Sequence, residues 1–237
     1  MSFSSDVKEE LSKLSNLANK EVVKYEFLGY LITSHISIEQ GKKNLKIKFS
    51  TENEYNINRF SKLLNNLLCT KYEIQITGKT FSITAIPPEL DEVIYKNEEI
   101  ILEQDKILKQ EILQKAFVRG AFLGSGSINN PKNSYHLEIL FSHLENAKFV
   151  LQILQDYDIK FKQIHKNKAF CIYAKDGEEI SKFLAFIGAN NSILKFEEIR
   201  VYRDIRNNVN RKVNCETANL NKTVNSALKQ IEAIQLL

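Results

Sequence analysis

One pattern of helical and alternating residues occurs twice in this chain, and the two copies are separated by a nearly constant offset. Residues 25–34 and 116–125 are apolar stretches with helical spacing, and each contains a glycine and ends in serine. Alternating apolar and polar residues, typical of strands, follow each copy. Three matched pairs are offset by 91, 92 and 89 residues, namely Gly29 with Gly120, Leu45 with Leu137, and Phe81 with Phe170. These offsets indicate a duplicated unit.

Each copy predicts helix, two strands, helix and two strands, followed by a further helical piece. The predicted fold class is therefore α+β, a tandem pseudo-two-fold repeat of αββαββα units with a C-terminal helical extension. Helices are predicted at 5–14 (with Ser5 as its cap), 20–34, 55–68, 105–124, 143–156, 176–187, 190–206 and 216–236, and the last two are joined by the asparagine-rich segment 207–214. Strands are predicted at 36–39, 45–50, 72–77, 80–85, 127–129, 135–141, 159–165 and 168–174. The predicted domains are the first repeat with its N-terminal helix (1–104), the second repeat (105–189) and the extension (190–237).

Glycines lie in the interior of both repeated helices, where glycine costs roughly 1 kcal/mol relative to alanine. A close approach of the two helices would explain Gly29 and Gly120, because only small residues let helix axes come nearer than ~8–10 Å. Further small residues of the second copy fit the same interface, namely Ala116, Ala121 and Gly124. The alternative is that the glycines are unrelated features of the core.

Composition and residue spacing limit the classes of function. The chain is 43% hydrophobic and 26% charged, as expected of a globular protein. It has no apolar run of ~18–20 residues and no secretory signal, so we expect a cytoplasmic protein without a membrane partner. Neither the cysteines nor the histidines have metal-ligand spacing (Cys69, Cys171, Cys215; His35, His136, His143, His165). We expect reduced thiols, no metal, no cofactor and no small-molecule substrate.

Charge is unevenly distributed, although the net charge is only +4. Residues 195–212 carry six basic and three acidic side chains, whereas residues 89–105 carry seven acidic side chains and one lysine. Arginine binds phosphate as a planar fork, and asparagine amides contact phosphates or base edges. The predicted DNA contacts are Arg200, Arg203, Arg206, Asn207, Asn210, Arg211 and Asn214. The alternative is a helix that docks on the acidic segment 89–105.

A second candidate surface is the face of the strands that points away from the helices. Alternation places Lys46 and Lys48 on this face in the first copy, and Lys160 and Lys162 in the second. Lysines on a curved sheet could follow a duplex through phosphate contacts. Glu73 and Glu138 fall on the same face and would repel phosphate, so an ordinary solvated face is the alternative.

Several strings of residues resemble the bacterial WhiA family. They are Met1–Ser5, residues 117–127, residues 135–138, and the asparagine-rich residues 206–211, which continue through 214–223. The resemblance covers nearly the whole chain. It implies a LAGLIDADG homing-endonuclease-like saddle and a role in regulating sporulation or cell division. Family members usually continue into a C-terminal helix-turn-helix domain, which we expect to be absent here because the chain stops at Leu237.

The resemblance also allows a test for catalysis. In the endonucleases that share the implied fold, each motif helix ends in an acidic residue, and the two carboxylates hold divalent metal. The matching positions here are Ser34 and Ser125, and a neutral hydroxyl is a poor ligand for Mg²⁺. No acidic residue lies between 27 and 38 or between 112 and 137. We therefore expect a chain that is not an enzyme.

The charge patterns predict binding to double-stranded DNA, and the resemblance implies a non-catalytic, nucleoid-associated regulator of cell division, chromosome segregation or sporulation. The alternative is a protein-interaction module that contacts a regulatory protein partner and does not bind DNA itself. A residual metal-dependent nuclease is a third hypothesis.

Overall fold

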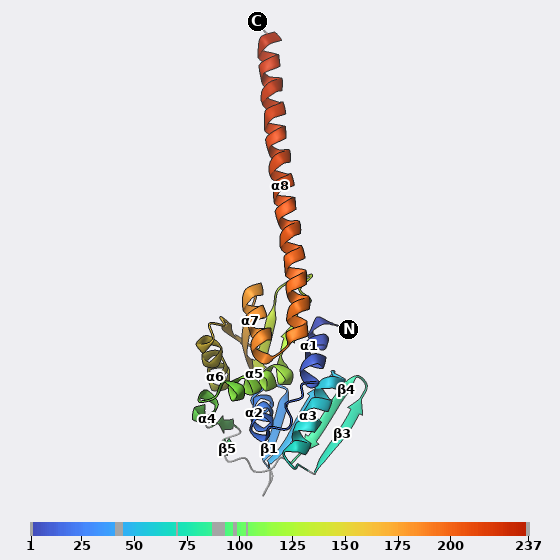
Figure 1. Cartoon of the computed structure of the whole chain (residues 1–237), viewed down its shortest axis with the longest axis vertical. Helices are drawn as coiled ribbons and strands as arrows, with labels where there is room; N and C mark the ends of the chain where they lie inside the picture. Colours follow the sequence, from blue (N-terminus) through green and yellow to red (C-terminus); the bar gives the residue numbers. More distant parts are fainter. Residues whose placement is uncertain are drawn as a thin grey trace. The chain divides into compact units, whose positions relative to one another are not determined.

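The computed structural model describes residues 2–40, 45–69, 71–86, 93–96, 99–102 and 104–235. The chain divides into two compact units, residues 1–196 and 197–237 (Figure 1). Both repeats lie in the first unit. The second unit consists, in its described part, of helix alone.

The first repeat forms a four-stranded sheet with two helices, preceded by the N-terminal helix α1. Its elements are α1 (Phe3–Ser12), α2 (Lys20–Leu31), β1 (Ile36–Gln40), β2 (Leu45–Thr51), α3 (Glu54–Asn66), β3 (Tyr72–Thr77) and β4 (Thr80–Ala85). The strands pair antiparallel in the order β1-β2-β4-β3. A short hairpin of β5 (Val93–Lys96) and β6 (Glu99–Leu102) follows.

The second repeat has the same succession of elements. They are α4 (Gln104–Leu108), α5 (Glu111–Ser125), β7 (Ser127–Ile128), β8 (Leu137–Phe141), α6 (Leu144–Asp156), β9 (Lys162–Lys166), β10 (Ala169–Ala174) and α7 (Gly177–Ile187). The strand order β7-β8-β10-β9 reproduces that of the first sheet. The predicted α+β tandem repeat is thus confirmed, and α8 (Asn190–Gln235) is the helical extension.

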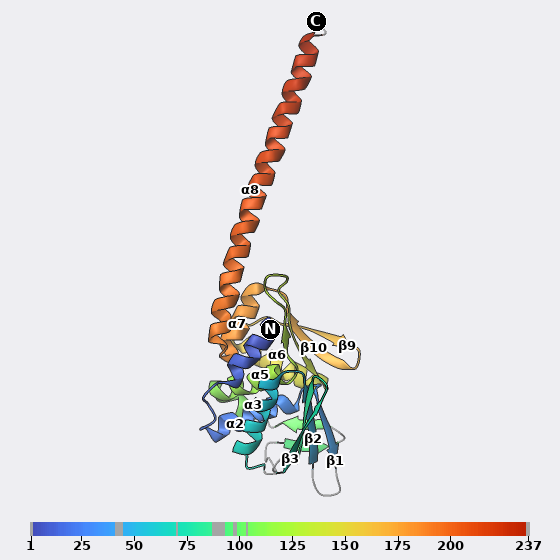
Figure 2. The same ribbon diagram turned by 90° about the vertical axis from the view of Figure 1, so that its right-hand side faces the viewer.

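The registers of the two sheets explain why one face of each is covered. In the first sheet Phe49 lies opposite Ile83, and in the second Phe141 lies opposite Phe170. Phe49, Ile83 and Phe141 are fully buried, and the helices lie on this side of both sheets (Figure 2). The residues between them point to the other face, as period-two alternation requires.

Helices α2 and α5 cross at their glycines. A Cβ atom added to Gly29 would lie 2.0 Å from the Phe117 carbonyl oxygen, and one added to Gly120 would lie 1.9 Å from the Glu26 carbonyl oxygen. Both contacts are with backbone, so no side chain can move aside to accept even a methyl group. The two helices approach each other at a distance that only glycine permits.

The other small residues of α5 lie along the same contact. Ala116 and Ala121 are fully buried, and the Ala121 nitrogen is 2.8 Å from the position that a Gly29 Cβ would take. A Cβ on Gly124 would meet the Thr33 side chain at 2.6 Å. The crossing therefore extends along α5 towards its C-terminal end.

Some predicted boundaries were wrong. Helix α1 begins at Phe3, and its cap is Ser2 rather than Ser5, because Ser2 Oγ accepts a hydrogen bond from the Ser5 N–H (3.2 Å). The helix predicted at 105–124 is divided between α4 and α5, because Gln110 has an extended backbone (φ −137°, ψ 118°). The hairpin β5–β6 was not predicted.

The largest correction concerns the C-terminal region. Residues 207–214, predicted as a connection between two helices, lie within the single helix α8. The whole of α8 contains no glycine or proline, and asparagine in a helix interior costs only a fraction of a kcal/mol relative to most residues. Repeated asparagines therefore do not interrupt it. Among the described residues, no helix is both long enough and apolar enough to cross a membrane.

Candidate nucleic-acid interface

The two serines at the positions of the motif acids meet on strand β8. Ser125 Oγ donates a hydrogen bond to the Leu140 carbonyl oxygen (2.6 Å) and accepts one from the Leu140 N–H (3.0 Å). The Ser34 N–H donates to the same carbonyl (3.1 Å). Helix α2 ends at Leu31, so Ser34 lies beyond its helix, unlike Ser125. The Ser125 hydroxyl thus binds β8 to the end of α5.

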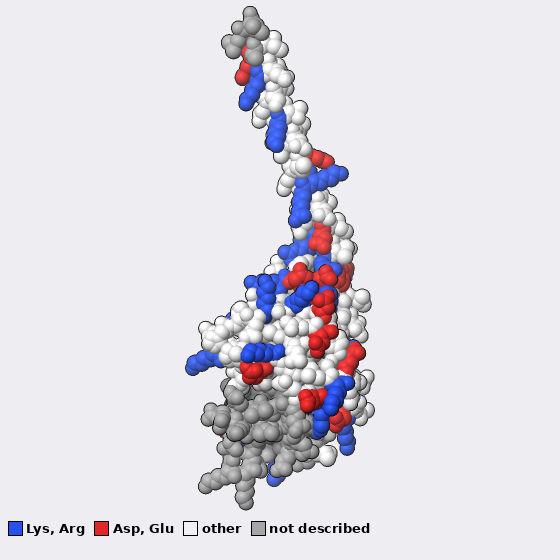
Figure 3. All heavy atoms as spheres, turned by 90° about the vertical axis from the view of Figure 1, so that its left-hand side faces the viewer, with Lys and Arg blue, Asp and Glu red and all other residues white. Residues whose placement is uncertain are grey.

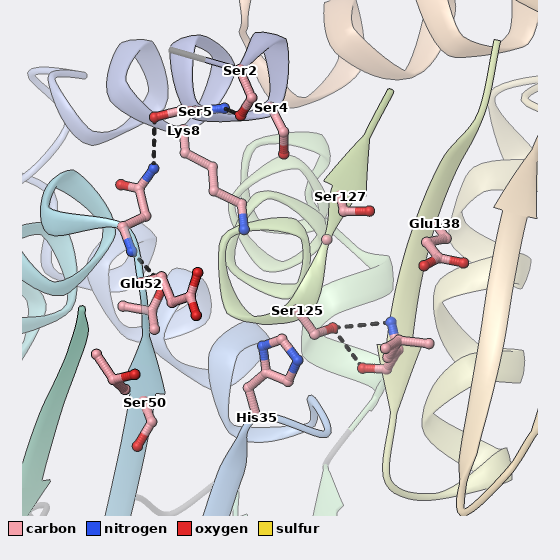
Figure 4. A pocket seen from close by; sticks show the side chains of 15 residues that line it. Ser2, Ser4, Ser5, Lys8, His35, Ser50, Glu52, Ser125, Ser127 and Glu138 are labelled. Atoms are coloured by element: carbon pink, nitrogen blue, oxygen red, sulfur yellow. Dashed lines mark hydrogen bonds between the residues drawn. The ribbon is translucent and has the colours of Figure 1, made fainter. Parts of the chain in front are cut away.

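A pocket of about 850 Å³ opens beside Ser125 (Figure 4). Helix α1 contributes Lys8 and, with its cap, three serines, while the segments after α2 and β2 contribute His35 and Glu52. Ser127 and Glu138 come from β7 and β8. The pocket therefore has walls from both repeats and from α1.

Lys8 is the central cation of this pocket. The residue is half-buried, and its side chain extends from α1 towards Ser125 and His35 (Figure 4). Burial lowers the pKa of Lys8 to about 8. Burial and the positive charge of Lys8 also lower the pKa of His35, while a hydrogen bond with the Gly124 backbone acts in the opposite direction. His35 is thus mainly neutral at pH 7, and Lys8 mainly charged.

Neither pocket carboxylate forms an ion pair with Lys8 among the described residues. Glu138 accepts hydrogen bonds from Lys166 (3.0 Å) and is 3.3 Å from His136 Nε2. Burial raises the pKa of Glu138, but these two neighbours outweigh it and hold that pKa below its usual range. Glu52 also lines the pocket and is exposed to solvent.

This set of residues does not fit a divalent metal ion. Such an ion needs several oxygen ligands, and catalysis by two metals needs anionic ones. Here Ser125 is engaged with β8, Glu138 with Lys166, and an ammonium group lies between the walls. The described residues contain no group of three or more potential metal-binding side chains of the His, Cys, Asp or Glu type.

The strand lysines lie on a face of mixed charge. Lys46 and Lys48 are exposed on β2, and in the register Lys46 lies opposite Glu39. Glu73 of β3 lies opposite Thr84, on the same face. Lys46 and Lys48 form no ion pair within the part of the chain that is described.

The lysines of the second copy differ from the prediction. Lys162 is exposed on β9 opposite Tyr173. Lys160 precedes β9, and its Nζ lies 3.4 Å from Asp158 Oδ1. The predicted strand began too early because Ile159 and Phe161 alternate with polar residues, although both are buried outside the sheet. Lys166, which was not predicted, lies on the open face of β9.

Helix α8 presents basic and amide side chains together. Its continuity places the predicted residues on one side, because each residue advances by about 100° and the set spans an arc of about 140°. The set is Arg200, Arg203, Arg206, Asn207, Asn210, Arg211 and Asn214. Most of these side chains are exposed, and Arg200 pairs with Glu197 (3.0 Å). Lys and Arg side chains recur along this helix (Figure 3).

The opposite side of the same stretch of α8 is apolar. Val201, Ile205, Val209 and Val213 are all more than half exposed. Residues 200–214 are therefore amphipathic, with arginine and asparagine on one side and aliphatic residues on the other. The alternative of docking on residues 89–105 concerns side chains that lie almost entirely outside the described residues, so it stays a hypothesis.

Comparison with known proteins identifies the family. A sequence profile described as the WhiA LAGLIDADG-like domain matches residues 114–206, and one described as the WhiA C-terminal HTH domain matches residues 209–237. A protein of Thermoanaerobacter sp. (strain X514) named probable cell division protein WhiA is 37% identical over the whole chain, which covers 80% of that protein. The chain belongs to the WhiA family.

Solved structures of the family agree with this assignment. The chain is similar to full-length DUF199/WhiA from Thermatoga maritima, with a TM-score of 0.73, 26% identity and coverage of 99% of this chain and 78% of the other. It is also similar to the N-terminal LAGLIDADG domain of DUF199/WhiA, with a TM-score of 0.62, 26% identity and coverage of 79% and 92%. The predicted family and its LAGLIDADG-like fold are confirmed.

The HTH match falls on residues that the sequence analysis placed in an extension without this domain. In the structure, residues 209–235 continue α8. The domain boundaries at 104 and 189 stay predictions.

Sequence reasoning missed Lys8 and the pocket. The sequence feature that bears on this pocket is the group of serines before Lys8, together with the helical spacing of the apolar residues around Lys8. Val7 and Leu11 are fully buried, and Lys8 lies beside that buried face. This pattern places Lys8 at the edge of the buried helix face, and only the fold brings Ser125 and Glu138 to the same pocket.

Proposed function

We propose that this WhiA-family chain is a non-catalytic DNA-binding regulator of cell division, chromosome segregation or sporulation that acts in the cytoplasm at the nucleoid. The observation that carries the proposal is the arginine and asparagine side of α8, which runs into the residues that match the HTH profile. Helix-turn-helix domains bind duplex DNA with a helix in the major groove. The names of the WhiA relatives support the link to cell division.

Charge reversal on α8 tests DNA binding. Replacing Arg203→Glu and Arg206→Glu together is expected to lower affinity for duplex DNA at least about tenfold at low salt, because each lost phosphate contact reduces counter-ion release. Fluorescence anisotropy with a labelled duplex from about 50 mM to about 200 mM salt measures both the affinity and its salt slope.

A variant with the same change of charge controls for net charge. Lys109→Glu with Lys132→Glu alters two exposed lysines outside the proposed contacts and should change affinity much less. If both double variants lose the same affinity for the duplex, the loss follows net charge alone. That result would count against a DNA contact on α8.

The apolar side of α8 supports a second candidate, an interaction with a regulatory protein partner. Exposed valine and isoleucine side chains are typical of a surface that another protein covers. Binding through such a surface responds little to salt, whereas DNA binding weakens steeply. A wild-type chain that retains no duplex even at low salt would favour this candidate.

The absence of catalysis is also part of the proposal. Incubation of supercoiled plasmid with the purified chain and Mg²⁺ or Mn²⁺ is expected to leave it uncut, because hydroxyl groups replace the motif acids and Lys8 repels cations. Agarose gel electrophoresis detects nicked or linear product. Cleavage that tracks the protein through purification would show that the chain is a nuclease.

A further inference from the structure

The pocket beside Ser125 contains a cation without a counter-ion. Within the residues that the structure describes, Lys8 forms no hydrogen bond and no ion pair. Removing an ammonium group from water without a partner is costly, and the group gains most from an anion that enters its pocket. The nearby Glu138 is engaged with Lys166, and Glu52 stays exposed to solvent.

Three serine hydroxyl groups of this pocket accept hydrogen bonds from N–H groups and keep their own protons. Ser2 Oγ accepts a hydrogen bond from the Ser5 N–H (3.2 Å), and Ser4 Oγ accepts one from the Ile128 N–H (3.4 Å). Ser5 Oγ accepts one from Asn53 Nδ2 (3.1 Å). A hydroxyl that accepts from an N–H still has its own proton to donate. Three serines therefore offer O–H donors on the wall that also holds the ammonium group.

The ligand that matches this wall is an anion with several acceptor oxygens. A cation would meet the Lys8 ammonium, and of the two lining carboxylates Glu138 is engaged with Lys166, which leaves only the solvent-exposed Glu52. A carboxylate has two acceptor oxygens in one plane, whereas phosphate has oxygens in several directions. Donors that come from Lys8 and from serines of α1 suit the second geometry better.

We infer that this pocket is a phosphate site, in which the Lys8 ammonium pairs with a phosphate oxygen and the α1 serines donate hydrogen bonds to the same group. The phosphate can belong to a nucleic-acid backbone or to a small free phosphate. The first source rests on the proposed DNA binding, and the second does not. The site lies where the resemblance implied metal-binding acids, so a fixed cation of the protein takes the place of the metal.

Two binding measurements on the full chain test the site and distinguish the sources. The first is the rise in unfolding temperature with sodium phosphate, compared with sodium chloride at equal ionic strength. The second is the affinity for a labelled duplex across a salt series. Lys8→Met, which keeps the length of the side chain, is compared with the wild type and with Lys13→Met, an exposed lysine of the α1 C-cap that pairs with Glu9.

We expect Lys8→Met to lose the response to phosphate, or to bind the duplex roughly tenfold more weakly with a salt slope reduced by about 0.9, as for one lost phosphate contact. If Lys8→Met binds the duplex more weakly, the site takes a nucleic-acid backbone. If Lys8→Met loses only the rise in unfolding temperature with free phosphate, the site takes a small phosphate. Lys13→Met should behave as the wild type in both. A Lys8→Met chain that equals the wild type in both measurements overturns the inference.

A pH series tests the same contact through the charge of Lys8. Duplex phosphates do not titrate between about pH 7 and about pH 9, whereas Lys8 loses its proton near pH 8. The other titratable groups that line the pocket are His35 and Glu138, whose lowered pKa values keep them neutral and ionised in this range, and the carboxyl group of Glu52. Wild-type affinity should fall across this range more than the affinity of Lys8→Met. The profile of Lys8→Met is the baseline, because the N-terminal amine titrates in both proteins. Parallel profiles overturn a backbone phosphate at Lys8. If the wild type binds no duplex, the proposed function fails and the phosphate measurement alone decides the site.

Discussion

Replacing Glu26→Gln is expected to lower the free energy of unfolding by about 3–5 kcal/mol, because it leaves two buried guanidinium groups without their counter-ion. Glu26 has a fully buried side chain on α2. Its Oε1 lies 2.6 Å from Arg59 Nε of α3, and its Oε2 lies 2.9 Å from Arg119 Nε of α5. One carboxylate thus joins the two repeats and is the counter-ion of both arginines.

Each arginine also donates a hydrogen bond to a backbone carbonyl group. Arg59 donates to the Leu14 carbonyl oxygen (2.9 Å), and Arg119 donates to the Ile187 carbonyl oxygen (3.2 Å). These bonds hold both guanidinium groups in the interior after Glu26 is neutralised. Urea-induced unfolding measures the loss. Glu21→Gln, an exposed change in the first turn of the same helix, should cost less than about 1 kcal/mol.

The same carboxylate makes stability depend on pH. Burial raises the pKa of Glu26, but Arg119 and Arg59 outweigh it and hold that pKa below its usual value. A depressed pKa means that the stabilisation is complete above the unfolded value of about 4.3 and is lost as the pH falls below it towards the folded value. Glu26→Gln should therefore lose less stability than the wild type on acidification. Equal acid sensitivity, or equal stability of the two Gln variants at pH 7, would contradict this role for Glu26.

The repeat and its sheets could be predicted because they depend on local periodicity. Phe49 and Ile83 alternate with polar residues, and so do Phe141 and Phe170, so the buried face follows from the sequence alone. The continuity of α8 was missed because asparagine is common in loops, although nothing in residues 207–214 prevents a helix.

The buried charges and the pocket depend instead on tertiary contacts. Glu26 lies between Tyr25 and Phe27, and Arg119 between Val118 and Gly120. A charge surrounded by buried apolar neighbours indicates a buried partner, but the sequence does not show which residue it is. Lys8 likewise shares a pocket with Ser125 only because α1 packs against α3 of the first repeat and β7 of the second.

The glycine crossing is where the two repeats depend on each other most directly, and Gly29→Ala is expected to destabilise the chain by about 2–4 kcal/mol. Alanine favours a helix by roughly 1 kcal/mol relative to glycine. Its methyl group, however, would lie 2.0 Å from the Phe117 carbonyl oxygen and 2.8 Å from the Ala121 nitrogen. The clash is with the backbone of α5, so relief requires the helices to separate and lose contacts along their crossing.

A double substitution distinguishes this mechanism from a local defect. Gly120→Ala should cost a similar amount, because its methyl group would meet the Glu26 carbonyl oxygen at 1.9 Å. One separation of α2 from α5 relieves both clashes, so Gly29→Ala with Gly120→Ala should cost clearly less than the sum of the single changes. Gly78→Ala is the comparison, because it has open space but a left-handed backbone (φ +61°) and should cost only about 1 kcal/mol. A Gly29→Ala chain as stable as the wild type in urea would mean that the helices do not cross as closely as described.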